Sequence, residues 1–398
     1  MSLFQDTRKL FDLPENVVYL DGNSLGPVVS SVHQNLDNRV REEWGKQLIN
    51  GWNVSGWLAE PARVGNRIAG LIGAAPDTLM VGESLSVQLY QALACALAMQ
   101  PARRIILSDT GNFPGDLYMA QSLIDRLQPG YRLKLVEPDA IEASLDSSIA
   151  VLMLTHVDYR TGRLHNLKNI TRQAHDLGIP VVWDLAHSTG ALAVDVAEHD
   201  VDFAVGCTYK YLNGGPGSPA FIYVAPRLHH GLQPALTGWL GHAKPFDFLQ
   251  SYQPAAGVEC LRIGTPTVLA MAALDAALDV WEGVPIDAVR AESIRLSEYF
   301  IAAVESRCPG LKLVSPRNAT KRGSQVSFAF EHGYAAMQAL IQYHGVIGDF
   351  RAPDLMRFAF TPLYLTMDEV EQAATAIEKV MTNREWDDPI LAQRATVT

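Results

Sequence analysis

The sequence predicts an α/β fold, with a largely parallel seven-stranded sheet flanked by helices and a smaller α+β domain. Between about residues 60 and 280, short β-type runs alternate with helical runs, which is the βαβ order. Several β-type runs are continuously apolar, as expected of strands that are buried on both faces of a parallel sheet. Beyond residue 281 the pattern changes to long helices and short strands, which indicates the second domain.

The predicted elements follow in chain order. Residues 17–20 form a short strand, and a helix begins near Pro27, because proline suits the first helical turn. The strands of the sheet are expected at residues 78–81, 105–108, 132–136, 149–154, 179–184, 201–207 and 220–224. Helices are expected at residues 86–99, 168–177, 286–307 and 367–382.

These elements predict three regions. Residues 1–60 are an N-terminal segment that joins the small domain, and residues 61–280 are the large α/β domain. Residues 281–398 are the small C-terminal α+β domain. In a largely parallel sheet, binding sites gather at the carboxyl ends of the strands, so we expect the site in the large domain.

Composition narrows the function. The chain has 398 residues, 48% of them apolar, and a formal charge of −11 with no long basic run, which argues against nucleic-acid binding. No apolar stretch approaches the roughly 18 residues of a membrane span, and the N-terminus lacks a signal-peptide pattern. The cysteines are widely spaced without a CxxC pair, which predicts no metal site and a reducing cytoplasm. They are Cys95, Cys207, Cys260 and Cys308.

Two strand ends carry a lysine and a carboxylate. Lys210 follows the apolar run 201–207 and precedes a Gly-rich bend, a position that suits a covalent bond from its amine to a carbonyl carbon. Asp184 ends the preceding run, 180–184, and a carboxylate there would keep a pyridine nitrogen protonated. Each residue has an ordinary alternative, Lys210 as a surface lysine and Asp184 as a helix cap. Their pairing predicts a pyridoxal cofactor.

A phosphate site is expected upstream. Residues 82–86 close a strand and open a helix, where free N–H groups and the helix dipole attract anions. A simple serine-capped helix is the alternative. Together with the lysine and the carboxylate, this element predicts pyridoxal 5′-phosphate.

Four motifs carry a family resemblance. They are Asp-Leu-Ala-His at 184–187, Tyr-Lys-Tyr-Leu-Asn at 209–213, Gly-Trp-Leu-Gly-His at 238–242 and Leu-Asp-Gly-Asn-Ser-Leu-Gly at 20–26. From about residue 17 to about residue 365 the chain resembles the kynureninase family, a branch of the fold-type I (aspartate aminotransferase-like) pyridoxal-phosphate enzymes. The lysine and aspartate alone indicate only the superfamily, whereas the motifs at 20–26 and 238–242 indicate this branch.

The resemblance implies the cofactor contacts. Leu85 and Ser86 would donate to the phosphate at the helix start. Phe113 would stack on the cofactor ring with Asp116 nearby. Thr155 would approach the ring oxygen.

It implies further contacts at the other end of the ring and at the phosphate. Asp184 would hold the pyridine nitrogen with His187 beside it. Tyr209 would contact the phosphate and relay protons. Trp239 and Thr265 would reach the phosphate across the interface of a homodimer.

The resemblance also implies the reaction. L-Kynurenine would be hydrolysed to anthranilate and L-alanine in tryptophan degradation or NAD biosynthesis, with 3-hydroxy-L-kynurenine as a second substrate. Lys210 would anchor the cofactor and move the Cα proton, and Arg357 would bind the substrate carboxylate with its planar fork. Trp52 stands where some members favouring the hydroxylated substrate carry histidine, which predicts a preference for unhydroxylated kynurenine.

Two alternatives remain open on the residues alone. A cysteine desulfurase or class V aminotransferase shares the fold, but a desulfurase needs a mobile nucleophilic cysteine, and Cys308 beside a proline looks structural. A serine hydrolase would use Ser24, because residues 22–26 match G-x-S-x-G after a strand. That serine comes too early in the chain for the usual elbow, which follows several strands.

Overall fold

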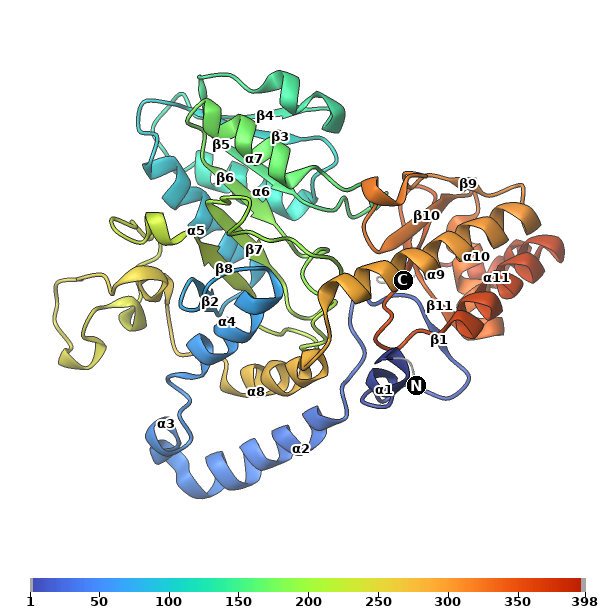
Figure 1. Cartoon of the computed structure of the whole chain (residues 1–398), viewed down its shortest axis with the longest axis horizontal. Helices are drawn as coiled ribbons and strands as arrows, with labels where there is room; N and C mark the ends of the chain where they lie inside the picture. Colours follow the sequence, from blue (N-terminus) through green and yellow to red (C-terminus); the bar gives the residue numbers. More distant parts are fainter. Residues whose placement is uncertain (1–2, 395–398) are drawn as a thin grey trace.

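The computed structural model describes residues 3–394, which carry two principal sheets (Figure 1). The ends of the predicted N-terminal and C-terminal regions, residues 1–2 and 395–398, lie outside the described residues. The larger sheet forms the cyan-to-green body of the molecule, and the smaller one lies in the orange-to-red part (Figure 1). In the described part of the chain, no helix combines the length and the apolar character that a membrane crossing requires.

The larger sheet confirms the predicted fold class. Within residues 3–394 it has seven strands in the order β2-β8-β7-β6-β5-β3-β4. Every neighbouring pair from β7 to β4 is parallel, and β8 runs antiparallel to β7 and to β2. The strands are β2 (Leu79–Val81), β3 (Ile105–Asp109), β4 (Arg132–Val136), β5 (Ile149–Thr155), β6 (Val181–Asp184), β7 (Phe203–Gly206) and β8 (Phe221–Val224).

Helices cover both faces of this sheet, which explains the continuous apolar runs. Successive side chains of a strand point to opposite faces. In β5, Val151 packs in the cluster that includes α5 (Leu85–Ala98), and Leu152 packs in the cluster that includes α7 (Leu167–Asp176). Both helices start one residue before their predicted bounds. Because both faces of the sheet are buried under helices, every residue of β5 is apolar except the last, Thr155.

The smaller sheet is antiparallel, in the order β12-β13-β10-β9. Its strands are β9 (Lys312–Leu313), β10 (Gln325–Ala329), β12 (Asp349–Arg351) and β13 (Leu355–Ala359). The helices beside it are α9 (Ile286–Arg307), α10 (Gly333–His344) and α11 (Met367–Thr382). The N-terminal strand β1 (Val18–Tyr19) pairs with β11 (Val346–Ile347) in this part of the molecule.

The prediction of a helix near Pro27 is wrong. The helix α2 (Ser31–Asn38) begins four residues later, because residues 28–30 pair with residues 10–12. Val29 bridges Phe11, and the backbone N–H groups of Asp12 and Ser30 bond across the same contact. That pairing holds the chain extended where the helix was expected. The other helices are α1 (Leu3–Arg8), α3 (Gly51–Val54), α4 (Glu60–Leu71), α6 (Pro114–Ile124) and α8 (Val268–Ala277).

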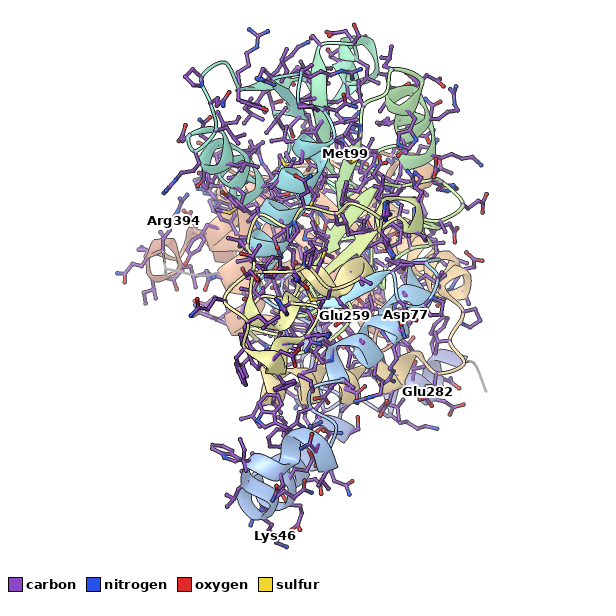
Figure 2. The ribbon with its side chains drawn as sticks, turned by 90° about the vertical axis from the view of Figure 1, so that its left-hand side faces the viewer. Lys46, Asp77, Met99, Glu259, Glu282 and Arg394 are labelled. Atoms are coloured by element: carbon purple, nitrogen blue, oxygen red, sulfur yellow. The ribbon has the colours of Figure 1, made fainter. Side chains whose placement is uncertain are left out.

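Two segments stand away from the body. The π-helical turn 39–47 and α3 form an arm, with Lys46 near its tip in Figure 2. Residues 226–261 make a second excursion, drawn in yellow in Figure 1, that contains short 3₁₀ turns. Both segments carry exposed apolar side chains.

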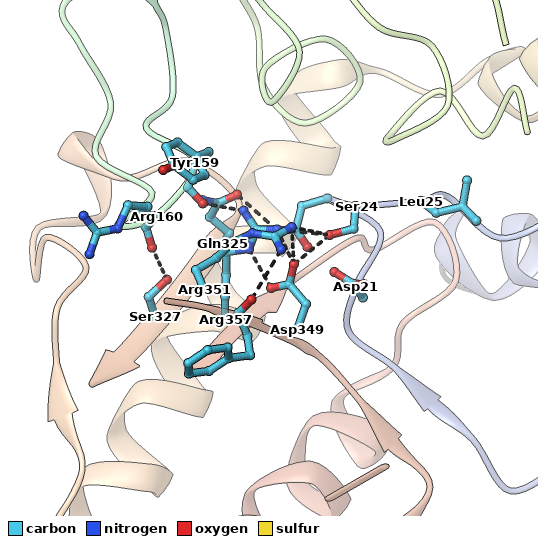
Figure 3. Close-up of polar contacts among 12 residues, drawn as sticks. Asp21, Ser24, Leu25, Tyr159, Arg160, Gln325, Ser327, Asp349, Arg351 and Arg357 are labelled. Carbon is cyan, nitrogen blue, oxygen red and sulfur yellow. Dashed lines mark hydrogen bonds and ion pairs between the residues drawn. The ribbon is translucent and has the colours of Figure 1, made fainter. Parts of the chain in front are cut away.

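A seam joins the smaller sheet to the turn 158–162 that follows β5 (Figure 3). The Gln325 side chain donates to the carbonyls of Asp158 and Tyr159, at 2.9 and 3.1 Å. The Ser327 hydroxyl donates to the carbonyl of Arg160. These bonds hold the turn against β10, beside the strand that carries Arg357.

Candidate active site

A cavity of about 310 Å³ lies at the carboxyl ends of β5 and β6 and beside the segment that follows β7. This is the edge at which a parallel sheet gathers its ligands, and the volume is at the lower end of ordinary ligand pockets. The structure brings ten of the residues predicted from the sequence together here. They are Leu85, Ser86, Phe113, Asp116, Thr155, Asp184, His187, Tyr209, Lys210 and Arg357.

Lys210 is held by a close approach of the N-terminal loop to its backbone. The Gly26 N–H donates to the Tyr209 carbonyl at 2.8 Å. A Cβ at Gly26 would lie 2.2 Å from the Lys210 carbonyl oxygen, so only glycine fits there. On the other side, the Asn213 N–H bonds the Lys210 carbonyl at 3.0 Å. Gly26, the last residue of the motif at 20–26, therefore packs against the backbone of Lys210 and fixes its position.

Two buried carboxylates lie beside the lysine. Asp184 ends β6 and accepts the Ala186 N–H at 2.8 Å, and Asp116 accepts from the Thr155 hydroxyl at 3.3 Å. Burial raises the pKa of both groups, and the charge of Asp184 raises the pKa of Asp116 further, well above its usual range. Lys210 offsets part of the rise at Asp184. Asp116 is therefore the more readily protonated of the two, and its hydrogen bond to Asp184 favours the charged form of Asp184.

His187 is a buried ring with an unmet hydrogen bond. Burial, followed by the nearby charges of Lys210 and Arg357, lowers the pKa of its imidazole well below the usual value, so the ring is neutral. Its Nδ1 has no hydrogen-bond partner among residues 3–394. Buried polar atoms are rarely left unpaired in folded proteins, so this atom at the cavity wall is one that a bound group can satisfy.

The helix α5 points its first turn at the cavity. Its cap residue Ser84 is extended, with φ −89° and ψ 162°, and the Ser84 side chain makes no capping hydrogen bond. The first N–H groups of a helix have no partner within it, and the helix dipole adds positive potential. Leu85 and Ser86 are the first two residues of this helix and line the cavity. An anion such as a phosphate fits this end.

Phe113 supplies a flat apolar surface. It caps α6, and 47% of its surface is exposed, although its ring packs edge-on against Tyr159 at 5.2 Å. A planar ligand ring laid on Phe113 would bury that surface. An amine, a buried carboxyl group, an unpaired imidazole nitrogen, an anion site and a stacking face therefore occur in one cavity, and together they fit pyridoxal 5′-phosphate.

Arg357 forms the opposite wall, on β13. Its Nε donates to Asp349 Oδ1 at 2.8 Å, and Asp349 faces it directly across the β12–β13 pair. Its Nη2 donates to the Ser24 hydroxyl at 3.0 Å (Figure 3). The guanidinium is thus fixed in one orientation before any substrate arrives.

The structure gives Ser24 no catalytic base. Its hydroxyl donates to Asp349 at 2.8 Å and accepts from Arg351 and Arg357. Among the residues that the structure describes, no histidine hydrogen-bonds this oxygen. Ser24 also follows the two-residue strand β1 of the small sheet region and not a strand of the large sheet. The serine-hydrolase alternative therefore loses its geometric basis.

Three predicted residues do not line the cavity of the single chain. The Trp52 ring packs on Trp57 at 5.4 Å within the arm, which leads the chain away from the site. Trp239 is 45% exposed and packs on Phe246, and Thr265 is exposed. Trp52 therefore does not line the cavity of one chain, and its contact with substrate stays a prediction. Trp239 and Thr265 were expected to act from a second subunit.

The cavity also holds residues that were not predicted from the sequence. Asn23, Tyr159 and Arg351 line it, and Asp349 lies behind them, wholly buried. Asp349 and Arg351 are two residues apart in β12, so both side chains lie on the same face of the strand. The sequence shows this two-residue spacing. It does not show that β12 pairs with β13, which places the two side chains at the cavity.

Sequence comparison identifies close relatives over nearly the whole chain. The kynureninases of Burkholderia mallei (strain SAVP1) and of Pseudomonas fluorescens are both 44% identical to it. In each case the match covers 98% of this chain and 95% of the relative. The family model described as the kynureninase C-terminal domain matches residues 289–377.

Solved structures share the fold at low sequence identity. A cysteine desulfurase from Escherichia coli has a TM-score of 0.79 and 19% identity, covering 96% of this chain and 99% of that one. A structure of C-DES with glycine covalently linked to its PLP cofactor has a TM-score of 0.78 and 18% identity, covering 93% of this chain and 98% of that one. At such identities these likenesses establish the fold only.

The cysteines do not supply a desulfurase nucleophile. All four are free and buried, and none lines the cavity in the described part of the chain. Burial raises the pKa of the Cys308 thiol to about 11, so the reactive thiolate is scarce at neutral pH. The desulfurase alternative therefore rests on the shared fold alone.

Proposed function

The chain belongs to the kynureninase family, and on that premise we propose that the cavity around Lys210 is its active site. The protein is a pyridoxal-phosphate-dependent hydrolase that cleaves L-kynurenine to anthranilate and L-alanine. The observation that carries the assignment of the site is the meeting of Lys210 and the buried carboxyl group of Asp184 in one cavity, in a chain 44% identical to curated kynureninases. We further propose 3-hydroxy-L-kynurenine as a second, poorer substrate.

The residues around the cofactor bind and orient it. When bound, the cofactor ring withdraws electrons from the bonds around the substrate Cα. Asp184 holds the proton on the pyridine nitrogen, and the neutral His187 lies beside it. The N–H groups of Leu85 and Ser86 bind the phosphate, and Phe113 covers one face of the ring.

The remaining residues act on the substrate. Arg357 attracts the α-carboxylate with the charge of its fixed guanidinium. The amine of Lys210 would accept the Cα proton and return it. Burial raises the pKa of the Tyr209 phenol, so Tyr209 is a neutral O–H donor next to the lysine. We propose that it passes protons between Lys210 and solvent.

The proposed function is tested by product formation. Purified protein with added pyridoxal phosphate should release fluorescent anthranilate from L-kynurenine, with stoichiometric L-alanine. The same assay with 3-hydroxy-L-kynurenine should give a lower kcat/KM. Sulfide release from L-cysteine without anthranilate from kynurenine would overturn the assignment in favour of a desulfurase.

We propose that two copies pair so that each completes the other's site. An apolar groove of about 750 Å³ contains Leu25 and runs beside residues 213–216, which follow Lys210. The arm and the excursion 226–261 also expose large apolar side chains, including Ile49 (75% exposed) and Phe248 (77% exposed). Apolar surface of this extent on a chain is typical of an interface. Trp239, Thr265 and Trp52 would then reach the partner's cavity.

Mixed dimers test this arrangement. Lys210→Ala and Trp239→Ala homodimers should both be impaired, but their heterodimer keeps one site with a lysine from one chain and a tryptophan from the other. Random co-expression should then restore about a quarter of wild-type activity, because half of the dimers are mixed and each has one intact site. Pairing Lys210→Ala with Asp184→Asn is the control, since both residues act in their own chain and no intact site forms. Activity equal to the sum of the parent homodimers would contradict the shared site.

The cell location and pathway are part of the proposal. Four free, buried cysteines suit a reducing compartment. We therefore propose a cytoplasmic location, and the cleavage of kynurenine would serve tryptophan degradation or NAD biosynthesis.

A further inference from the structure

Two arginines share one buried carboxylate at the wall of the cavity (Figure 3). Asp349 on β12 is wholly buried, and Arg357 on β13 contacts both of its oxygens. Arg351, also on β12, places its Nη2 2.6 Å from Asp349 Oδ2. Both arginines also bond the hydroxyl of Ser24, so the carboxylate and the hydroxyl hold the two guanidinium groups side by side.

Arg357 has little bonding capacity left. A guanidinium has five N–H donors. Arg357 uses one toward Asp349 from Nε, two from Nη2 toward Asp349 and Ser24, and one from Nη1 toward the Tyr159 carbonyl. Its side chain is 1% exposed. Only one N–H remains for a substrate, so Arg357 alone cannot offer two parallel hydrogen bonds to a carboxylate.

Arg351 has the capacity that Arg357 lacks. Its side chain is 33% exposed and lines the cavity. Its bonds go from Nη2 to Asp349 and Ser24, and from Nη1 to its neighbour's carbonyl at a long 3.3 Å. Within residues 3–394 its Nε has no hydrogen-bond partner, and one Nη1 hydrogen is also left over.

The charges at this wall favour an anion. Two guanidinium groups face a single fully buried carboxylate, Asp349. The other acid beside these arginines is Asp21, whose pKa burial and the charge of Asp349 raise to about 7, and Asp116 and Asp184 line the same cavity beside Lys210. His187 on the facing side is neutral. The wall formed by Arg351, Arg357, Asp349 and Asp21 therefore carries excess positive charge.

We propose that Arg351 is a second substrate-binding residue that receives the α-carboxylate together with Arg357. This rests on the proposed function in one respect: the substrate is an α-amino acid. Arg357 contributes its remaining N–H and the fixed charge, and Arg351 contributes its exposed donors. The carboxylate is bound in the space between them, with Asp349 holding both guanidinium groups in place.

The test compares a substrate with its decarboxylated analogue. Arg351→Gln should raise KM for L-kynurenine by about 10- to 100-fold, the range expected for a charge-assisted hydrogen bond, and change kcat by less than about threefold. Inhibition by kynurenamine, which lacks the α-carboxylate, should be unchanged. Arg351→Lys should restore part of the loss in KM. Arg295→Gln, which removes one exposed arginine on α9, is the matched charge control and should behave as wild type.

Each outcome decides one claim. An unchanged KM in Arg351→Gln, or equal weakening of kynurenine and kynurenamine, would overturn the role of Arg351. Equal weakening would mean that the substitution disturbs the cavity as a whole. If the wild-type protein fails to cleave kynurenine, the proposed function itself is overturned, and the role of Arg351 in binding that substrate is overturned with it.

Discussion

Replacing Lys210 by alanine is expected to reduce kynurenine cleavage by at least roughly 10³-fold, because the variant lacks the only amine at the centre of the cavity that can move the Cα proton. Among the described lining residues, Lys210 is the only lysine. The loss should fall on kcat. Anthranilate fluorescence under saturating kynurenine measures it, and the visible absorption of the bound cofactor should change at the same time.

The controls separate chemistry from charge. Lys210→Arg keeps a positive charge beside Asp184 but cannot exchange a proton at neutral pH, so it should be as inactive as the alanine variant. Lys168→Ala removes an exposed lysine on α7 and should retain full activity. A Lys210→Arg variant with more than a tenth of wild-type activity would contradict the role of Lys210 in proton transfer.

Replacing Asp184 by asparagine is expected to lower kcat by roughly 10²- to 10³-fold, the effect typical of removing one preorganised electrostatic group. The amide is neutral and so cannot stabilise the protonated pyridine nitrogen as the carboxylate does. Asparagine can still accept the Ala186 N–H, so the local backbone should persist. Steady-state kinetics and thermal unfolding, measured on the same preparation, test both statements.

A buried carboxylate elsewhere in the same sheet provides the matched control. Asp202 is also buried, immediately before β7, and bonds His175, Arg227 and the Val181 N–H. Asp202→Asn should lower stability without a comparable loss of kcat, because it lies away from the cavity. Asp184→Glu keeps the charge and should retain more activity than Asp184→Asn. If the asparagine and glutamate variants are equally active, the charge of Asp184 is not what the reaction needs.

Much of the fold follows from local sequence signals. The continuous apolar strands predicted the parallel sheet, because burial on both faces leaves no polar side. The helices α9 and α11 have the predicted bounds at both ends. For α11 the reason is a capping box, in which Thr366 and Glu369 bond each other's backbone N–H groups. Where a distant segment intervened, as in the pairing of residues 28–30 with residues 10–12, the local signal at Pro27 was misleading.

The residues of the candidate site also fall into those that local sequence signals indicate and those that depend on contacts between distant segments. Lys210, Asp184 and the start of α5 could be predicted because strand ends and helix starts are visible in a single sequence. Arg351 and Asp349 could not, since their place at the cavity depends on the pairing of β12 with β13. Trp239 and Trp52 lie on excursions whose position relative to the cavity no pattern within one chain specifies.

The seam between the smaller sheet and the turn 158–162 bears on how this enzyme can be altered. Gln325, Ser327 and Arg357 all bond main-chain carbonyls of that turn and not its side chains. Hydrogen bonds to main-chain carbonyl groups do not depend directly on the side chains of the turn. They do depend on the positions of the carbonyl groups along the chain. Substitution of Arg160 would therefore leave these main-chain bonds in place. The Thr161 hydroxyl bonds Asp158 within the turn, and an insertion or deletion there would shift the carbonyl that Arg357 contacts. We therefore expect the length of this turn to influence the proposed binding of substrate by Arg357.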